Sequence, residues 1–190
     1  MLAREKGCLV DGVTANQRQS ESAKRLAAES GMTDRVRFSV ADATDLPCED
    51  GTYDGGWFLE SIFYMGHEAA LREARRVLKP GSVLVITDFV RLDATSREFT
   101  ELLWDLLATA HIRKEQYPEL LRGAGFELLD LVDVTREVIH MTEIKSREIV
   151  SAHREELLQV ADEDYLAFVD QVNAQFVDNA GYVFVKARAV

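Results

Sequence analysis

The sequence predicts an α/β fold with a mostly parallel sheet, and three observations support this. Short runs rich in β-branched and aromatic residues alternate with segments of helical periodicity, which is typical of strand–helix–strand crossover units. The chain has 190 residues, enough for one ordinary domain with a sizeable core. It is 47% hydrophobic with only 3 Pro and 11 Gly, and no repeat or linker divides it. We therefore expect a single domain over residues 1–190.

The first third of the chain predicts three strands, one helix and one loop. Cys8–Val13, Val36–Val40 and Tyr53–Leu59 are short runs with strand composition. Asn16 is suited to cap a helix that continues to Glu29, because its side-chain oxygen can accept hydrogen bonds from the free amides of the first turn. The polar residues between the second and third strands predict a loop.

A second helix and the clearest strand follow. Helical spacing of apolar residues begins near His67, and Lys79-Pro80-Gly81 is expected to end that helix. Ser82–Phe89 is the strongest strand candidate. Thr95 and Glu98 then fit a capping box for another helix. The apolar stripe of that helix consists of Phe99, Leu102, Leu103, Leu106, Leu107 and Ala110.

The second half of the chain is more helical. The spacing of its apolar residues predicts a helix over Lys114–Ala124. Two further strands are expected at Phe126–Val134 and Tyr182–Ala189. About two helices separate them, roughly Ser146–Gln159 and Asp162–Asn179.

The charge balance, the lengths of the apolar runs and the cysteine spacing argue against several classes of protein. Lys and Arg number 22 against 33 Asp and Glu, which gives a formal charge of −11 and disfavours binding to nucleic acids or anionic membranes. No apolar run approaches the roughly 20 residues of a membrane helix, and the first residues lack the apolar stretch of a secretory signal. Cys8 and Cys48 stand in no metal-ligand or redox spacing. We expect a cytoplasmic protein with small-molecule or protein partners and no metal site.

Several motifs occur in a fixed order along the chain. They are Val13-Thr14 through Gln19, then Val40–Pro47 with Tyr53-Asp54, and then Arg76–Gly81. Tyr117–Phe126 and Gly181-Tyr182-Val183 follow. In this order the motifs resemble the class I S-adenosylmethionine-dependent methyltransferases, specifically the branch that modifies small molecules and includes sugar O-methyltransferases and glycine-type N-methyltransferases.

The resemblance implies a Rossmann-like, doubly wound sheet with strand order 3-2-1-4-5-7-6, an antiparallel last strand and helical lid insertions. The insertions would be residues 91–113 and 140–180. The strands described above correspond to the family's second to seventh. The family's first strand and its GxGxG loop would precede Cys8, so we expect the central strand to be missing and two sheet edges to face each other across its place. We interpret this as an N-terminally truncated reading of a longer methyltransferase, or as a strand supplied by another segment or subunit.

The resemblance also implies S-adenosylmethionine as cofactor. Thr14 and Gln19 would satisfy the two ribose hydroxyls, since each can donate and accept. Asp42 would accept a hydrogen bond from the adenine amino group. Alternatively, Thr14 merely begins a helix, Gln19 is solvated and Asp42 forms an Asx-turn. The cofactor-binding residues implied are Thr14, Gln19, Asp42, Ala43, Leu59 and Glu60.

The residues that would carry catalysis are Asp88, Tyr64 and His67. Methyl transfer requires alignment, and a base where the acceptor must lose a proton. Relatives that methylate sugar hydroxyls carry a His in the segment where Phe63 and Tyr64 stand, and this departure puts a His-based mechanism in doubt. The remaining candidate bases are Asp88, His67 and His111. A capping role for Asp88 and a packing role for His67 are the alternatives.

We therefore expect methyl transfer from S-adenosylmethionine to an O, N or C atom of a small-molecule acceptor. The alternative is a non-catalytic relative that uses the sheet and lid for binding or dimerisation. Apolar lid residues fit an acceptor pocket, core packing and a homodimer interface equally well.

Overall fold

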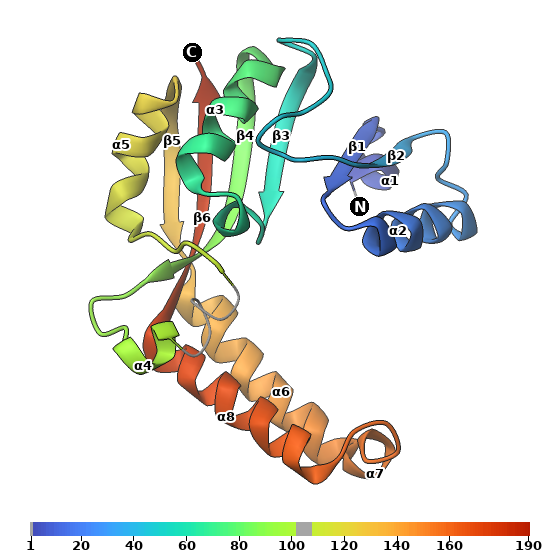
Figure 1. The fold of residues 1–190 in the computed structure, drawn as a ribbon, viewed down its shortest axis with the longest axis vertical. Helices are drawn as coiled ribbons and strands as arrows, with labels where there is room; N and C mark the ends of the chain where they lie inside the picture. The colour runs from blue at the N-terminus through green and yellow to red at the C-terminus, as the bar shows by residue number, and fades with distance from the viewer. Residues whose placement is uncertain (1, 102–107) are drawn as a thin grey trace.

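The computed structural model describes residues 2–101 and 108–190, whose strands form two groups (Figure 1). The first group pairs β1 (Val10–Thr14) with β2 (Val36–Val40) in parallel and carries α1 (Leu2–Lys6) and α2 (Gln17–Glu29). The second is a four-stranded sheet in the order β3-β4-β6-β5. Its strands are β3 (Tyr53–Leu59), β4 (Leu78–Arg91), β5 (Phe126–Asp133) and β6 (Ala180–Ala189).

The strand order confirms the predicted fold class. β3 and β4 are parallel, and β6 runs antiparallel to both β4 and β5. With β2-β1 placed before β3, this is the order implied by the resemblance without its central strand. Among the described residues, β1 pairs only with β2 and β3 pairs only with β4. Each of these two strands therefore has one side that is not hydrogen-bonded to a neighbouring strand.

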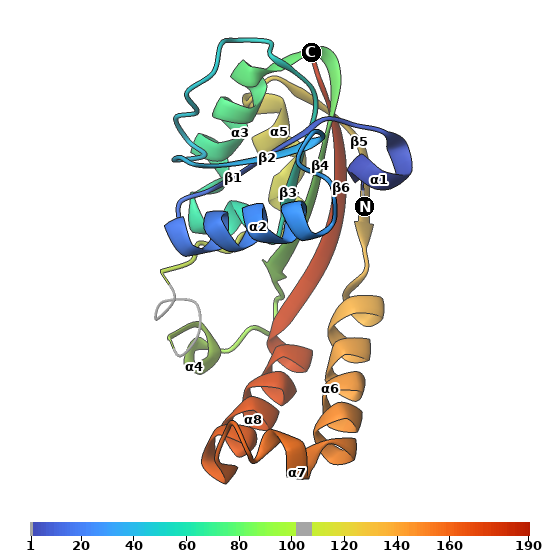
Figure 2. The same ribbon diagram turned by 90° about the vertical axis from the view of Figure 1, so that its right-hand side faces the viewer.

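Helices cover one face of the four-stranded sheet. Figure 2 shows α3 (His67–Val77) and α5 (Tyr117–Gly123) side by side on that face. Along β6 the side chains alternate, so that Val183, Val185 and Ala187 are buried while Lys186 is exposed. Buried apolar residues of α3, α5, β4 and β6 form one cluster, which constitutes the main core.

The core hardly reaches the first group of strands. Among the buried apolar residues that the structure describes, Ala3 is the only one that precedes Ile62. Leu9, Leu26 and Val40 are exposed by 80%, 58% and 44%. Burial of apolar surface is the main stabilising term in folding, so contacts other than a shared core must fix β1 and β2 against the rest of the chain.

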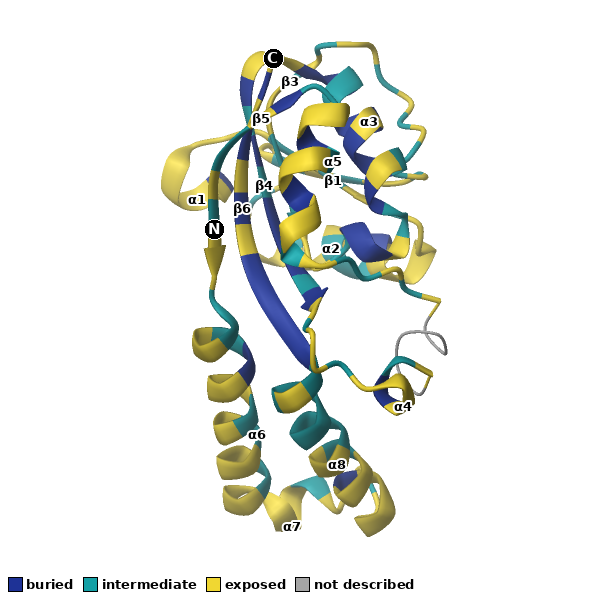
Figure 3. Ribbon diagram, turned by 90° about the vertical axis from the view of Figure 1, so that its left-hand side faces the viewer, coloured by how far each residue is buried: buried dark blue, intermediate teal, exposed yellow. Residues whose placement is uncertain are grey.

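An arm built of two long helices and a short one between them projects beyond the carboxyl ends of β3 and β4 (Figures 1 and 3). It consists of α6 (Met141–Ala152), the short α7 (Arg154–Leu157) and α8 (Glu163–Asn179), which leads directly into β6. A hydrogen bond from Asn173 Nδ2 to Ser146 Oγ (2.8 Å) joins its two long helices. Smaller elements are η1 (Ile62–Tyr64), α4 (Arg97–Phe99), η3 (Lys114–Gln116) and the π-helix η4 (Arg136–His140).

Two boundaries differ from the prediction. Lys79-Pro80-Gly81 does follow the end of α3, but it lies inside β4, because the strand already begins at Leu78, paired with Tyr53. The cap of α4 is Ser96, whose side chain accepts from the Phe99 amide (3.1 Å). Thr95, the predicted cap, instead donates to the Asn179 carbonyl (2.7 Å). Of the apolar stripe expected beyond it, residues 102–107 lie outside the described part of the chain.

The remaining elements agree with expectation except at their ends. The first strand is displaced by one to two residues, and the last strand begins at Ala180. The first of the two expected arm helices begins earlier, at Met141, whereas the second begins at Glu163, one residue later than expected. The segment Lys114–Ala124 divides into η3 and α5. Gly125 follows α5 with φ +83°, the left-handed conformation that ends many helices.

Candidate active site

The end of β1 and the start of α2 bring Thr14 and Gln19 together. Asn16 caps α2 by accepting from the Arg18 and Gln19 amides (2.9 and 3.2 Å), which turns the helix back toward the strand end. The Thr14 hydroxyl then donates to Gln19 Oε1 at 2.7 Å. Both groups can also accept, so the pair can exchange its mutual hydrogen bond for those of a ligand diol.

Asp42 lies just beyond β2, at the same end as Thr14. The Ala41 amide donates to the Thr14 carbonyl (3.2 Å), which joins the two strand ends. Asp42 Oδ1 accepts from the Thr44 amide (2.8 Å) and hydroxyl (2.7 Å). This is the Asx-turn that the sequence left open as the alternative. These hydrogen bonds hold the pKa of Asp42 below its ordinary value. Neither of them uses Oδ2, so the turn leaves that oxygen able to accept from a ligand.

Glu60 follows the carboxyl end of β3 in a left-handed backbone conformation, with φ +47°. This conformation is uncommon for a residue with a side chain and clusters at functional sites. The Tyr182 hydroxyl of β6 donates to Glu60 Oε1 at 2.6 Å. Burial, followed by the Glu60 hydrogen bond, raises the pKa of Tyr182 to about 12. The preceding residue, Leu59, is 58% exposed, so this end of β3 is accessible.

A buried polar cluster lies beside this strand end. His67 Nε2 and Asp88 Oδ2 are 2.8 Å apart, and the Tyr117 hydroxyl donates to the same oxygen at 2.6 Å. Asp88 and Tyr117 are fully buried, and His67 is 4% exposed. Asp88 Oδ1 has no hydrogen-bond partner among the described residues. Burial, followed by the proximity of Asp88, raises the pKa of Tyr117, so its hydroxyl stays a donor.

Tyr64 stands apart from that cluster. It ends η1, its ring centroid lies 4.6 Å from that of Phe63, and its side chain is exposed. Phe63 is buried against His111, with ring centroids 4.7 Å apart. Burial lowers the pKa of His111.

The structure therefore gathers the predicted residues into two sets. Thr14, Gln19, Asp42 and Ala43 lie at the carboxyl ends of β1 and β2. Leu59, Glu60, Tyr64, His67 and Asp88 lie near those of β3 and β4, with His67 and Asp88 in direct contact. The hydrogen bonds found within the described ranges join members of one set, or members to other residues, and none crosses from one set to the other.

Sequence reasoning missed the partners of two site carboxyl groups. Tyr182 is separated from Glu60 by 122 residues and Tyr117 from Asp88 by 29 residues. Local pattern indicates a tyrosine on a strand or helix face but not the side chain that it meets. It also missed the pair Glu73 and Arg76, whose spacing of three on a helix is a detectable signal.

The strand order is that of the class I S-adenosylmethionine-dependent methyltransferases without the central strand. A family model described as "Methyltransferase domain" matches residues 1–86. Over 196 residues the chain is 30% identical to (+)-O-methylkolavelool synthase of Herpetosiphon aurantiacus, covering 98% of this chain and 68% of that protein. The chain belongs to this methyltransferase family.

Two further comparisons show how far the similarity extends. Methyltransferase GfsG of Streptomyces halstedii is 36% identical over 141 residues, which cover 72% of this chain and 51% of that protein. The solved structure of the [4+2]-cyclase SpnF has a TM-score of 0.77 and 30% identity, covering 99% of this chain and 68% of that one. The chain thus spans between about half and about 70% of the length of the first curated relatives. No helix in the described ranges is long and apolar enough to cross a membrane.

Proposed function

We propose that this protein transfers a methyl group from S-adenosylmethionine to a small-molecule acceptor. The observation that carries the proposal is the arrangement of Thr14, Gln19 and Asp42 at two adjoining strand ends, in a chain of methyltransferase ancestry. Solved methyltransferases of this fold have been captured with S-adenosylmethionine or S-adenosylhomocysteine. The cofactor supplies the methyl group, and the chain supplies binding, alignment and a place for the acceptor.

The polar groups at the ends of β1 and β2 fit an adenosyl group. We propose that Thr14 and Gln19 hold the ribose hydroxyls. Their side chains lie together, joined by a hydrogen bond of 2.7 Å. Asp42 Oδ2 would accept from the adenine amino group while Thr44 keeps Oδ1, and the Ala43 amide would face the ring. Leu59 and Glu60 would adjoin the methionine end of the cofactor.

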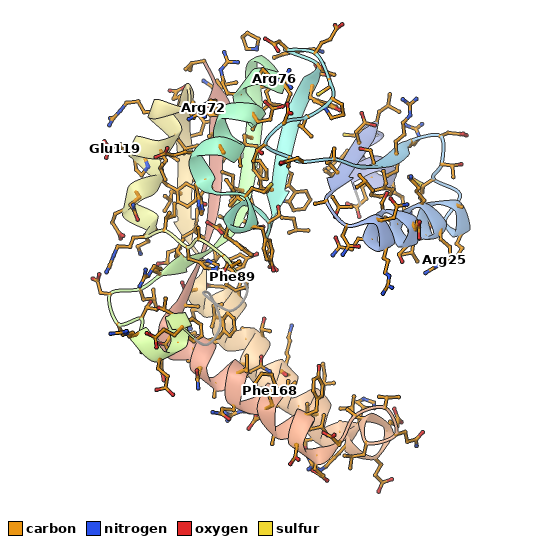
Figure 4. The ribbon with its side chains drawn as sticks, in the orientation of Figure 1. Arg25, Arg72, Arg76, Phe89, Glu119 and Phe168 are labelled. Carbon is orange, nitrogen blue, oxygen red and sulfur yellow. The ribbon has the colours of Figure 1, made fainter. Side chains whose placement is uncertain are left out.

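The acceptor would lie near the carboxyl ends of β3 and β4, under the arm. Phe176 of α8 packs on Phe89 and Phe99, with ring centroids 5.7 and 5.2 Å apart, and anchors the arm to the sheet end. Farther out, the apolar side chains of the arm are exposed, among them Phe168 (Figure 4). They include Met141, Ile144, Tyr165 and Phe168, exposed by 43 to 57%. We propose that residues 140–180 and the described parts of 91–113, which are 91–101 and 108–113, form a lid over a partly apolar acceptor.

We propose that Asp88, His67 or Tyr64 removes the proton from the acceptor. The first two form one buried pair, so either can take a proton only after the site has opened toward it. A catalytic hydrogen bond often tightens only in the substrate complex, so this burial does not exclude them. Tyr64 is exposed and accessible directly.

The test is titration with S-adenosylhomocysteine in a calorimeter. We expect micromolar binding by the wild-type chain, and about tenfold weaker binding by Asp42→Asn, which keeps Oδ1 for the Asx-turn but presents an amide to the adenine amino group. Asp45→Asn, three residues further along the same exposed loop, is the matched control and should bind as the wild type does. Absence of heat up to millimolar ligand would overturn the proposal and favour a non-catalytic scaffold.

A second candidate is a ring-forming reaction on the same scaffold. It is favoured by the 30% identity to a structure named as a [4+2]-cyclase. Transfer of label from methyl-labelled S-adenosylmethionine to any acceptor of a small-molecule panel supports methyl transfer. Cofactor binding without transfer to any of them, with conversion of a linear polyene substrate, would support the cyclase.

A further inference from the structure

Two side chains of α3 fasten the segment between β2 and β3. The Arg76 guanidinium donates to the carbonyl oxygens of Leu46 (3.0 Å) and Cys48 (2.8 Å), and to Asp50 Oδ1 (2.8 Å). It also donates to both carboxylate oxygens of Glu73, at 2.9 and 2.5 Å. A planar guanidinium with five N–H donors can serve so many acceptors at once, and an ammonium cannot. We name Arg76 and Glu73 together the Arg76–Glu73 clamp.

The clamp also uses the backbone. Glu73 Oε1 accepts from the Leu46 amide (2.7 Å), and the Arg76 carbonyl accepts from the Gly51 amide (2.9 Å). Glu73 is only 8% exposed, and its charge is balanced by Arg76, whose hydrogen bond is the main cause that lowers the pKa of Glu73. Residues 46–51 are thereby held at both ends and in the middle.

The clamp connects the two groups of strands. Helix α3 is part of the main core through Ala70, Leu71 and Ala74. The clamped segment begins four residues after Asp42 and belongs to the chain that leaves β2. Figure 4 shows Arg76 on α3 at the end where this chain passes to β3. Because the core hardly extends into the first group, this polar contact is well placed to set its position.

We infer that Arg76 and Glu73 are positioning residues for the adenosyl group. By holding residues 46–51 on α3, they fix where Asp42 and Ala43 stand relative to Glu60 at the end of β3. Misplacement of binding groups by about 1 Å is enough to weaken a site strongly. The ligand in this inference rests on the proposed function, whereas the clamp itself is a contact that can be tested without any ligand.

Three variants separate positioning from general stability. Arg76→Lys keeps the positive charge but loses the fork of donors. Glu73→Gln keeps an oxygen for the Leu46 amide but loses the ion pair. Arg72→Lys is the matched control, because Arg72 lies one turn earlier on α3, is exposed and lines a hollow beside α5 instead of the clamped segment.

Amide hydrogen exchange without ligand is the first measurement. In Arg76→Lys we expect exchange at Leu46 and Gly51 to rise at least tenfold, while the amides of β4 and β6 keep their protection. The second measurement is binding and turnover. We expect Kd for S-adenosylhomocysteine and KM for S-adenosylmethionine to rise about tenfold, with kcat at saturating cofactor within twofold of wild type.

Each outcome decides the inference. Unchanged exchange at Leu46 and Gly51, or wild-type affinity in a variant whose clamp has opened, would overturn it. If β4 and β6 also lose protection in Arg76→Lys, that variant is destabilised as a whole. Glu73→Gln is then measured in its place, with the same criteria. If the wild-type chain itself binds no S-adenosylhomocysteine, the proposed function fails, and the positioning of an adenosyl group fails with it, while the exchange data still decide whether the clamp holds the segment.

Discussion

Replacing Tyr117 by phenylalanine removes one hydroxyl from the buried cluster around Asp88 and leaves the ring in place. The hydroxyl donates to Asp88 Oδ2 at 2.6 Å inside a fully buried site, and the other oxygen of the same carboxyl group already lacks a partner in the part of the chain that the structure describes. After the change, His67 is the remaining partner of Asp88. We therefore expect a loss larger than that of an ordinary surface hydrogen bond.

The magnitude follows from the charge and burial of the acceptor. A hydrogen bond to a charged group contributes about 1.5 to 3 kcal/mol, and a buried carboxyl group that loses one of its hydrogen-bond partners is less well compensated for its desolvation. We expect the free energy of unfolding to fall by about 2 kcal/mol. For a chain of this size, that corresponds to a decrease in Tm of about 4 to 8 °C.

Urea unfolding followed by circular dichroism measures this change, with unaltered m-values as the check on two-state behaviour. The matched control is Tyr53→Phe. The Tyr53 hydroxyl donates to the exposed Asp11 at 3.3 Å, and its removal should lower the free energy of unfolding by less than about 0.5 kcal/mol. If Tyr117→Phe is no more destabilising than Tyr53→Phe, the buried cluster does not stabilise the fold as argued.

Three further predictions concern local structure. Asn16→Ala should lower stability by about 1 kcal/mol, seen as a loss of helical signal from α2, because two first-turn amides lose their acceptor. Gly12→Ala should destabilise the β1–β2 pair by about 1 to 3 kcal/mol in urea unfolding, since its Cβ would lie 2.5 Å from the Phe38 ring. Because Arg76 lowers the pKa of Glu73, the folded state binds fewer protons than the unfolded state, so the pair stabilises fully above the ordinary glutamate pKa and less as the pH falls through the lowered one. The stability difference between wild type and Glu73→Gln should shrink between pH 6 and pH 3, and a constant difference would contradict this account.

Local signals predicted the elements well where chain geometry alone decides them. Asn16 and Ser30-Gly31 delimit α2 because a cap and a left-handed glycine act within a few residues, and the structure has that helix from Gln17 to Glu29. Lys79-Pro80-Gly81 follows the end of α3 as predicted, but the next strand begins at Leu78 and not at Ser82, because the chain passes from helix to strand without a loop. There, pairing with β3 begins at Leu78 and overrides the local break.

In the candidate site, too, contacts between residues close in sequence could be predicted, and contacts between distant residues could not. Thr14 and Gln19 are five residues apart across a strand end and a helix start, so their contact follows from local geometry. The contacts of Asp88 with His67 and of Glu60 with Tyr182 depend on which elements become neighbours in the sheet. That information is spread over the whole chain, and no single stretch of sequence carries it.

The place of β6 has a consequence for how this half of the protein is made. It lies between β4 and β5 yet follows both along the chain, and its residues 180–188 pair with residues 83–91. On the ribosome, β3, β4 and β5 emerge before the strand that joins them, so the middle of the sheet is filled last. Contacts of such long sequence separation fold slowly. A nascent chain therefore leaves the edges of β4 and β5 that face β6 without their partner strand until residues 180–189 have been synthesised, which is the interval in which a chaperone would matter most.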